Sequence, residues 1–133
     1  MSGWYGPGKQ NLAGAGNALT AVLAAQVIDE ATYVYARTHA TMEIANVPAA
    51  SKTGSPVTLA SVTLNAAGEI DCADFTVSSL TGNTSEAVLI YIETAAADAS
   101  RIPLLYINGL SIVPNGGNYV FQIASSSPYL GRF

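Results

Sequence analysis

The sequence predicts an all-β protein: a single-domain, antiparallel β-sandwich or barrel of about seven to eight short strands. Runs rich in Val, Ile, Thr and Tyr recur along the chain, and turn signals separate them about every 8–12 residues. The length of 133 residues fits one domain. A sandwich and a barrel give the same strand spacing, so the choice between them stays open.

The N-terminal segment, residues 1–18, is predicted to be a Gly-rich arm that precedes a β domain over residues 19–133. It contains five glycines and one proline, which favour irregular backbone. Trp4 and Tyr5 lie in this arm, and large aromatic side chains gain little there unless they dock onto another surface. We therefore expect an irregular, unpacked arm that contacts a partner.

The first half of the domain gives mixed signals. Residues 20–28 (TAVLAAQVI) predict a strand, although their alanines also allow a helix. Residues 31–46 are ambiguous, because Tyr33-Val34-Tyr35 favours a strand whereas residues 41–45 allow a helical turn. Residues 48–56 contain two prolines, a glycine and two serines, and this composition predicts a loop.

The strand signals become regular after residue 56. Residues 86–93 (EAVLIYIE) are apolar on both faces, which predicts a central strand covered on each side. Pro103 lacks a backbone donor, so its strand is expected to start there or to lie at an edge. Asn108-Gly109 is a hairpin signal, and residues 114–117 predict another turn. The strands predicted in this half cover residues 57–64, 69–72, 75–79, 86–93, 102–107 and 118–124.

Charge is scarce in this sequence. Only 11% of the residues are charged, against a usual ~25%, and the formal net charge is −4. Because the basic residues are scattered, we expect no binding to nucleic acid and none to an anionic membrane. A surface poor in charge is weakly protected against association, which suits a subunit of a tight assembly. The five basic residues are Lys9, Arg37, Lys52, Arg101 and Arg132.

No catalytic, cofactor or metal site is predicted, and we do not expect an enzyme. His39 is the only histidine, and an ordinary structural hydrogen bond is favoured for it over the base of a small hydrolase. Glu69, Asp71 and Asp74 form the densest carboxylate group. They could bind calcium, but a solvated face is favoured because no shaped calcium loop is recognisable.

The single cysteine, Cys72, excludes an intrachain disulfide and fits synthesis in a reducing cytoplasm. Cys72 lies in a strand pattern without a basic neighbour, and we interpret it as a small buried hydrophobe.

Tyrosine is the most informative residue type, because it is enriched in interface cores and the chain has seven. Tyr91, Tyr106 and Tyr119 are interpreted as half-buried sheet residues. The two loops at residues 48–56 and 95–101 are candidates for ligand recognition. The predicted interface residues lie at the two ends of the chain: Trp4, Tyr5, Tyr129, Leu130 and Phe133.

A series of segments recurs in a recognisable order: DEATYVYA (29–36), THATM (38–42), VTLASVT (57–63), GEIDCAD (68–74), EAVLIY (86–91), ADASR (97–101), LYI (105–107) and VPNGG (113–117). In pattern and order these segments resemble small structural proteins of tailed bacteriophages. The resemblance covers roughly residues 20 to 124. At its C-terminal end the chain departs from the pattern, because relatives run into a Trp-Asp-Asn-Gly segment where this chain has Ala124-Ser125-Ser126-Ser127-Pro128.

The resemblance implies a virion component with a compact β fold, present in many copies. The favoured role is a capsid cement (decoration) protein on the outside of the shell. Its implied partners are the major capsid protein and copies of itself, in a symmetric oligomer such as a trimer. The alternative role is a tail-associated or fibre-associated subunit that recognises a ligand on the host surface.

Overall fold

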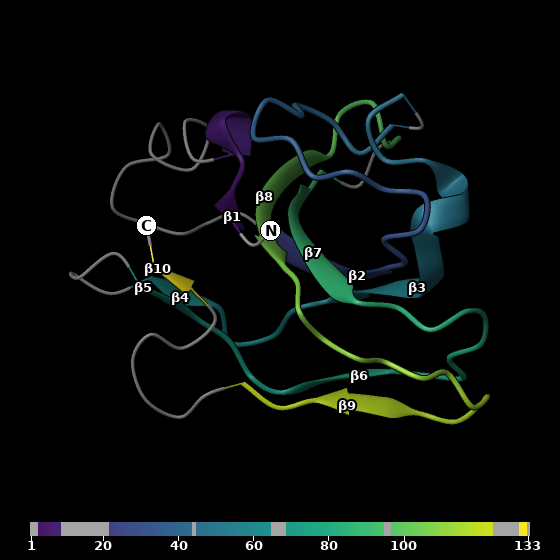
Figure 1. Cartoon of the computed structure of the whole chain (residues 1–133). Helices are drawn as coiled ribbons and strands as arrows, with labels where there is room; N and C mark the ends of the chain where they lie inside the picture. The colour runs from purple at the N-terminus through teal and green to yellow at the C-terminus, as the bar shows by residue number, and fades with distance from the viewer. Residues whose placement is uncertain are drawn as a thin grey trace.

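The computed structural model describes residues 3–8, 22–43, 45–64, 69–94, 97–123 and 131–132. Within these ranges the chain is nearly all β, and every strand pairing is antiparallel (Figure 1). The predicted fold class is therefore confirmed. The described strands form three separate sheets and no closed barrel.

Seven described strands have three or more residues, which agrees with the number expected. They are β2 (Val22–Ile28), β3 (Lys52–Thr58), β5 (Glu69–Asp71), β6 (Phe75–Val77), β7 (Ala87–Glu93), β8 (Ile102–Ile107) and β9 (Tyr119–Phe121). The shorter elements are β1 (Gly3–Trp4), β4 (Thr63–Leu64), β10 (Gly131–Arg132) and the 3-10 turn η1 (Ala49–Ser51).

The largest sheet has the strand order β1-β8-β7-β2-β3, and we call it the main sheet. β7 lies at its centre and pairs with β2 over the whole of both strands, from Val22↔Glu93 to Ile28↔Ala87. Every residue of β7 except Glu93 is buried. The expectation of a central strand covered on both faces is thus confirmed.

Each face of the main sheet packs against a separate hydrophobic cluster, because successive side chains of a strand point to opposite faces. One face, with Ile90, packs on the smaller sheets β6–β9 and β10–β5–β4. The other face, with Leu89, packs under the described part of residues 29–51, which we call the covering segment. This arrangement makes the fold a sandwich with an additional cover (Figure 1). The described residues of 31–46 form turns and irregular backbone within that cover and contain no strand. Residue 44, within the helical turn considered at 41–45, lies outside the described residues, and Val47 N donates to Glu43 O at 2.8 Å.

The expectation of an unpacked N-terminal arm is wrong for residues 3–8. β1 extends the main sheet beside β8, with Trp4 opposite Leu105, and the backbone N–H of Tyr5 donates to Leu104 O at 2.9 Å. Gly8 approaches β8 so closely that a Cβ atom there would lie 2.2 Å from Pro103 O. The glycine therefore permits close backbone packing in this segment. Residues 9–18 lie outside the described residues.

The region predicted as a loop at 48–56 and a strand at 57–64 is divided differently. Strand β3 begins at Lys52 and includes Pro56, which is tolerated because β3 is an edge strand. The pairing ends at Thr58, and Ser61 has a φ of 54°. The chain then enters β4 in a different sheet. Only the edge position of β3 explains why loop-type residues occur within a strand.

The Asn108-Gly109 signal marks a bend and not a hairpin turn, because the chain continues beside the residues that precede β7, where Leu110 N donates to Glu86 O at 2.9 Å. Gly109 has a φ of 78°, which glycine adopts readily. The next strand, β9, pairs with β6 in a different sheet from β8. The turn predicted at 114–117 is present, and Asn115 Oδ1 accepts a hydrogen bond from Gly117 N at 2.9 Å.

Candidate functional site

A cluster of tyrosines joins the N-terminus to the covering segment. Tyr5 is completely buried, and its hydroxyl is hydrogen-bonded to that of Tyr33. The Tyr33 hydroxyl also contacts Nδ1 of His39 at 3.1 Å. Tyr35 stacks on Tyr106 with ring centroids 5.2 Å apart. The ordinary hydrogen bond expected for His39 is therefore present, and its described partner is a tyrosine.

Burial keeps the groups of this cluster neutral at physiological pH. It raises the pKa of Tyr5, and it raises the pKa of Tyr33 to about 12. Burial lowers the pKa of His39 below its ordinary value. Both tyrosines are protonated, and the imidazole is biased to its neutral form. The cluster therefore joins the N-terminal residues to the covering segment by packing and hydrogen bonds, without a charged group.

The Tyr106 hydroxyl is buried and has no hydrogen bond of ordinary geometry within the described part of the chain, although the Glu30 carboxylate lies close enough to interact with it. Burial, followed by the nearby carboxylate of Glu30, raises the pKa of this phenol. The interpretation of Tyr106 as half-buried is corrected, because its side chain is fully enclosed by β1, the covering segment and the main sheet. Tyr91 is also buried, whereas Tyr119 remains partly exposed.

The carboxylates of β5 and its surroundings do not form the solvated face that was favoured. Glu69 is only 5% exposed, whereas Asp74 is exposed. Asp71 accepts a hydrogen bond from Cys72 N at 2.9 Å, and Asp74 accepts one from Ile123 N at 2.7 Å. No group of three or more metal-ligating side chains occurs among the described residues.

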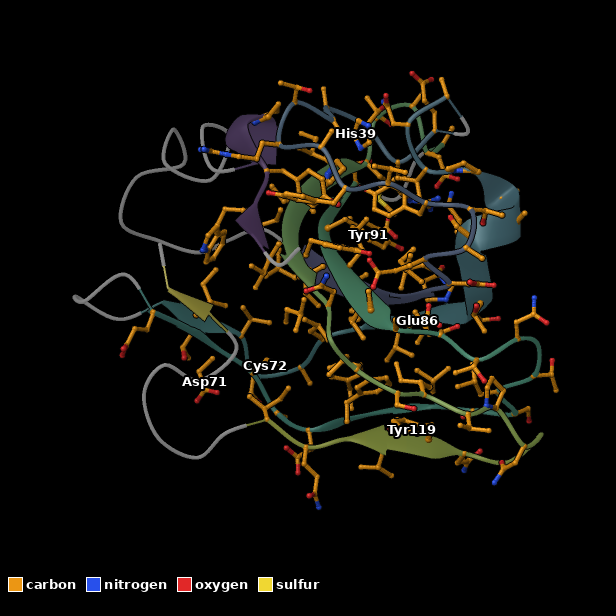
Figure 2. All side chains as sticks on the ribbon, viewed as in Figure 1. His39, Asp71, Cys72, Glu86, Tyr91 and Tyr119 are labelled. Atoms are coloured by element: carbon orange, nitrogen blue, oxygen red, sulfur yellow. The ribbon has the colours of Figure 1, made fainter. Side chains whose placement is uncertain are left out.

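Cys72 is buried, as expected. Burial, together with the charges of Asp71 and Asp74, raises the pKa of its thiol to about 11. The thiol is therefore a poor nucleophile near neutral pH. Figure 2 places Asp71 and Cys72 in the layer of the smaller sheets, away from Tyr91 and His39.

The two loops predicted as recognition loops lie side by side, and charged side chains join them. Lys52, at the start of β3, forms an ion pair with Asp98 at 2.8 Å and donates to Met42 O at 3.0 Å. Arg101 binds Asp98 at 2.8 Å and Glu93 at 2.7 Å. The Arg101 carbonyl also accepts a hydrogen bond from Met42 N at 2.9 Å. The covering segment, β3 and residues 97–101 are thus tied together.

A cavity of about 320 Å³ opens beside this ion-pair network, and we call it the loop pocket. Its volume is at the lower end of the ~300–1,000 Å³ typical of small-molecule sites. Gln26, Tyr91 and the β3 residues Lys52 and Ser55 line it from the main sheet. Asp98 and Arg101 line it from residues 97–101. Tyr91 lies between the main sheet and the covering segment (Figure 2).

Gln26 has a structural task in the loop pocket. The pairing of β2 with β3 shifts register between Ala25 and Val27. The Gln26 side-chain amide fills this irregularity by donating to Thr53 O at 3.0 Å and Gly54 O at 3.2 Å. A buried glutamine therefore replaces backbone pairing where the edge strand departs from the ladder.

The charges around the loop pocket compensate one another. Hydrogen bonds from Lys52 and Arg101 lower the pKa of Asp98, and bonds to Glu93 and Asp98 raise the pKa of Arg101. Burial raises the pKa of Tyr91 to about 12, so its hydroxyl is protonated and is not a general base at neutral pH. The pocket is suited to a small polar, uncharged ligand held by hydrogen bonds.

The predicted interface residues have different surroundings. Tyr5 is enclosed within its own chain and is not accessible to a partner. Trp4 is half-buried against the main core. Tyr129, Leu130 and Phe133 lie outside the residues whose side chains are described. The sequence analysis missed four exposed valines as contact candidates: Val22, Val34, Val113 and Val120.

Comparisons with known proteins add no relative. No model of a protein family matches the chain, and no curated protein matches it. In the ranges that the structure describes, no helix has the length and apolar character required to cross a membrane.

Proposed function

We propose that this protein is a structural component of a bacteriophage virion, a cement protein that binds the outside of the major capsid shell and stabilises it. The resemblance over residues 20 to 124 supports this role. The strongest support is that charged side chains pair with one another within the chain. Lys52, Glu93, Asp98 and Arg101 pair with one another, while valines such as Val34 remain exposed.

A cement protein works by contacting several shell subunits at once. Charged residues are depleted from the cores of protein interfaces, since removing a charge from water is unfavourable. Exposed valines and uncharged polar side chains avoid that penalty, so they suit contacts with the shell and with copies of this chain. Because the main sheet is packed on both faces, the outer surfaces of the protein that would contact the shell are supported by a rigid core.

The test of this role compares particles with and without the protein. Particles that lack it should release their genome at a lower temperature than complete ones, and re-adding the purified chain should restore the difference. An unrelated protein at the same concentration is the control. Equal stability of the two kinds of particle would contradict a cement role.

The loop pocket favours a second candidate function, that of a tail-associated or fibre-associated subunit that binds a host ligand. Its loops lie together through the Lys52–Asp98 ion pair and enclose space for a small polar group. A glycan unit has this chemistry.

The candidate ligand function is tested by blocking the pocket. Ser55 lines the pocket and is exposed, so Ser55→Trp fills the opening without disturbing the core. Labelled Ser55→Trp protein should lose adhesion to host cells, while Ser111→Trp, at another exposed serine, should keep it. A wild-type chain that does not adhere to host cells excludes this candidate. A copy number per particle similar to that of the major capsid protein would also favour the cement role over the tail-associated or fibre-associated role.

A further inference from the structure

The free edge of strand β3 is protected against pairing with another strand. It contains Lys52 and Pro56, Gly54 within it has a φ of 68°, and its pairing with β2 is irregular. A charge, a proline and a break in register are the features by which natural sheets prevent edge-to-edge association. The edge of the main sheet at β3 is therefore a poor template for a further strand.

Strand β9 has none of these protections. The segment Asn118–Gln122 (NYVFQ) carries no charge and no proline. Its pairing with β6 is regular, with Phe75↔Phe121, Thr76↔Val120 and Val77↔Tyr119. Among the described strands, none pairs with its other edge. Figure 1 shows β9 at the margin of the molecule, with β6 on its inner side.

The backbone groups that face this open edge can be assigned. Gly117 O accepts from Leu80 N at 2.9 Å, and Ile123 N donates to Asp74 Oδ1 at 2.7 Å, so residues 117 and 123 face the β6 side. Backbone groups of successive strand residues point to opposite edges. Residues 118, 120 and 122 therefore direct their N–H and C=O groups outward, and all three are exposed.

We propose that β9 is the edge through which two copies of this chain associate, as an antiparallel pair about a two-fold axis at Val120. Because each copy carries a net charge of −4, two copies meet without repulsion only where the surface is uncharged. The carboxylate of Asp74, directly before β6, already accepts a hydrogen bond from Ile123 N. A second copy is thus the occupant that this edge fits.

The edge is also complementary to itself. With the axis at Val120, the two Val120 residues exchange both backbone hydrogen bonds, and Asn118 of one copy lies opposite Gln122 of the other. Both of these side chains are amides, which donate to and accept from one another. Pairing would convert the two-stranded β6–β9 sheet into a continuous four-stranded one. The added backbone hydrogen bonds would satisfy the outward N–H and C=O groups of β9 in both copies.

Sedimentation velocity of the purified full chain tests the proposal without any phage particle, so its outcome is independent of the cement role. We expect a dimer that dissociates on dilution. Val120→Lys places two like charges at the axis and should raise the dimer dissociation constant about tenfold or more. Val113→Lys, at a valine that is also exposed (62%) but lies outside β9, should leave it unchanged. A wild-type chain that stays monomeric, or equal weakening by both variants, would overturn the proposal.

A cysteine variant tests the register even if Val120→Lys disturbs the fold. Directly opposite, hydrogen-bonded residues of an antiparallel pair have Cα atoms ~5.5 Å apart, within the range that a disulfide spans. Val120→Cys should therefore give a covalent dimer on mild oxidation. Val34→Cys is the control, because Val34 is more exposed (82%) and lies in the covering segment. Equal cross-linking of both variants would indicate random collision and would contradict a two-fold axis at Val120.

Discussion

The hydroxyl of Tyr35 donates a hydrogen bond to the backbone carbonyl of Trp4 at 2.8 Å. This bond connects the covering segment to β1, the first strand of the chain. Tyr35 also meets the edge of Tyr5, with ring centroids 5.0 Å apart. One half-buried tyrosine therefore holds together the N-terminus and the cover of the main sheet.

Tyr35→Phe should lower the free energy of unfolding by about 1 kcal/mol, because it leaves the Trp4 carbonyl without this partner and keeps the ring packing. Denaturation with urea measures the change. Val34→Ala is the control at the neighbouring position. The Val34 side chain is 82% exposed, so its truncation should change the free energy of unfolding by less than ~0.5 kcal/mol. Equal stabilities of Tyr35→Phe and wild type would show that the bond contributes nothing.

Tyr106→Phe, unlike Tyr35→Phe, should not lower the free energy of unfolding. The hydroxyl of Tyr106 is buried with no hydrogen bond of ordinary geometry in the described part of the chain and with the Glu30 carboxylate nearby, so removing it relieves a poorly satisfied polar group. We expect the free energy of unfolding to stay constant or to rise by up to about 1 kcal/mol. The same urea denaturation serves here, and a clear loss of stability would mean that the hydroxyl has a partner in solution.

Gly8→Ala should destabilise the fold by about 1–3 kcal/mol, because its Cβ would lie 2.2 Å from Pro103 O and would push β1 away from β8. Gly6→Ala is a matched control in the same helical turn, since its Cβ would meet the closest atom, Arg37 O, at 3.5 Å. Thermal unfolding followed by circular dichroism compares the two variants. Similar midpoints for both would argue against close packing of the N-terminal segment.

Asp98→Asn removes the Lys52–Asp98 ion pair, which joins the recognition loops, and the Arg101–Asp98 ion pair within one of them. Because the Asp98 side chain is 42% exposed, we expect a loss of less than about 1 kcal/mol at neutral pH. The pKa of Asp98 is lowered in the folded state by Lys52 and Arg101, so its contribution is present above the ordinary aspartate pKa and is lost as the pH falls through the lowered value.

The difference in stability between wild type and Asp98→Asn should therefore disappear on acidification. Urea denaturation at neutral pH and at acid pH measures it. High salt should reduce the neutral-pH difference, because salt screens exposed charges. A difference that is independent of both pH and salt would point to packing as its cause.

The strands that were predicted best are those whose hydrophobic pattern also shows how many of their faces are covered. The unbroken apolar run of β7 identifies a strand covered on both faces, and the alternation of Tyr119, Val120 and Phe121 identifies one with a single exposed face. β3 was only partly predicted, because Gly54 and Pro56 are loop residues in most settings. Its place at the edge of the main sheet, which makes them acceptable, depends on the rest of the fold.

The candidate site was predictable only in part. Composition identified residues 48–56 and 95–101 as loops with binding potential. It gave no indication that Lys52 and Asp98 would meet, because they are 46 positions apart and neither lies in a motif. The burial of Tyr5 was missed for a similar reason. The glycines around it favour irregular backbone locally, whereas Gly8 serves close packing against a strand from the far end of the chain.

The pairing of Gly3 with Tyr106 has a consequence for synthesis of the protein on the ribosome. Gly3 and Trp4 find their strand partners only after residues 105 and 106 have been translated. Until β8 leaves the exit tunnel, Tyr5 and the inner side chains of the covering segment remain exposed to water and to other nascent chains. The sheet thus closes late, and the cell must shield its N-terminal aromatic residues during that interval.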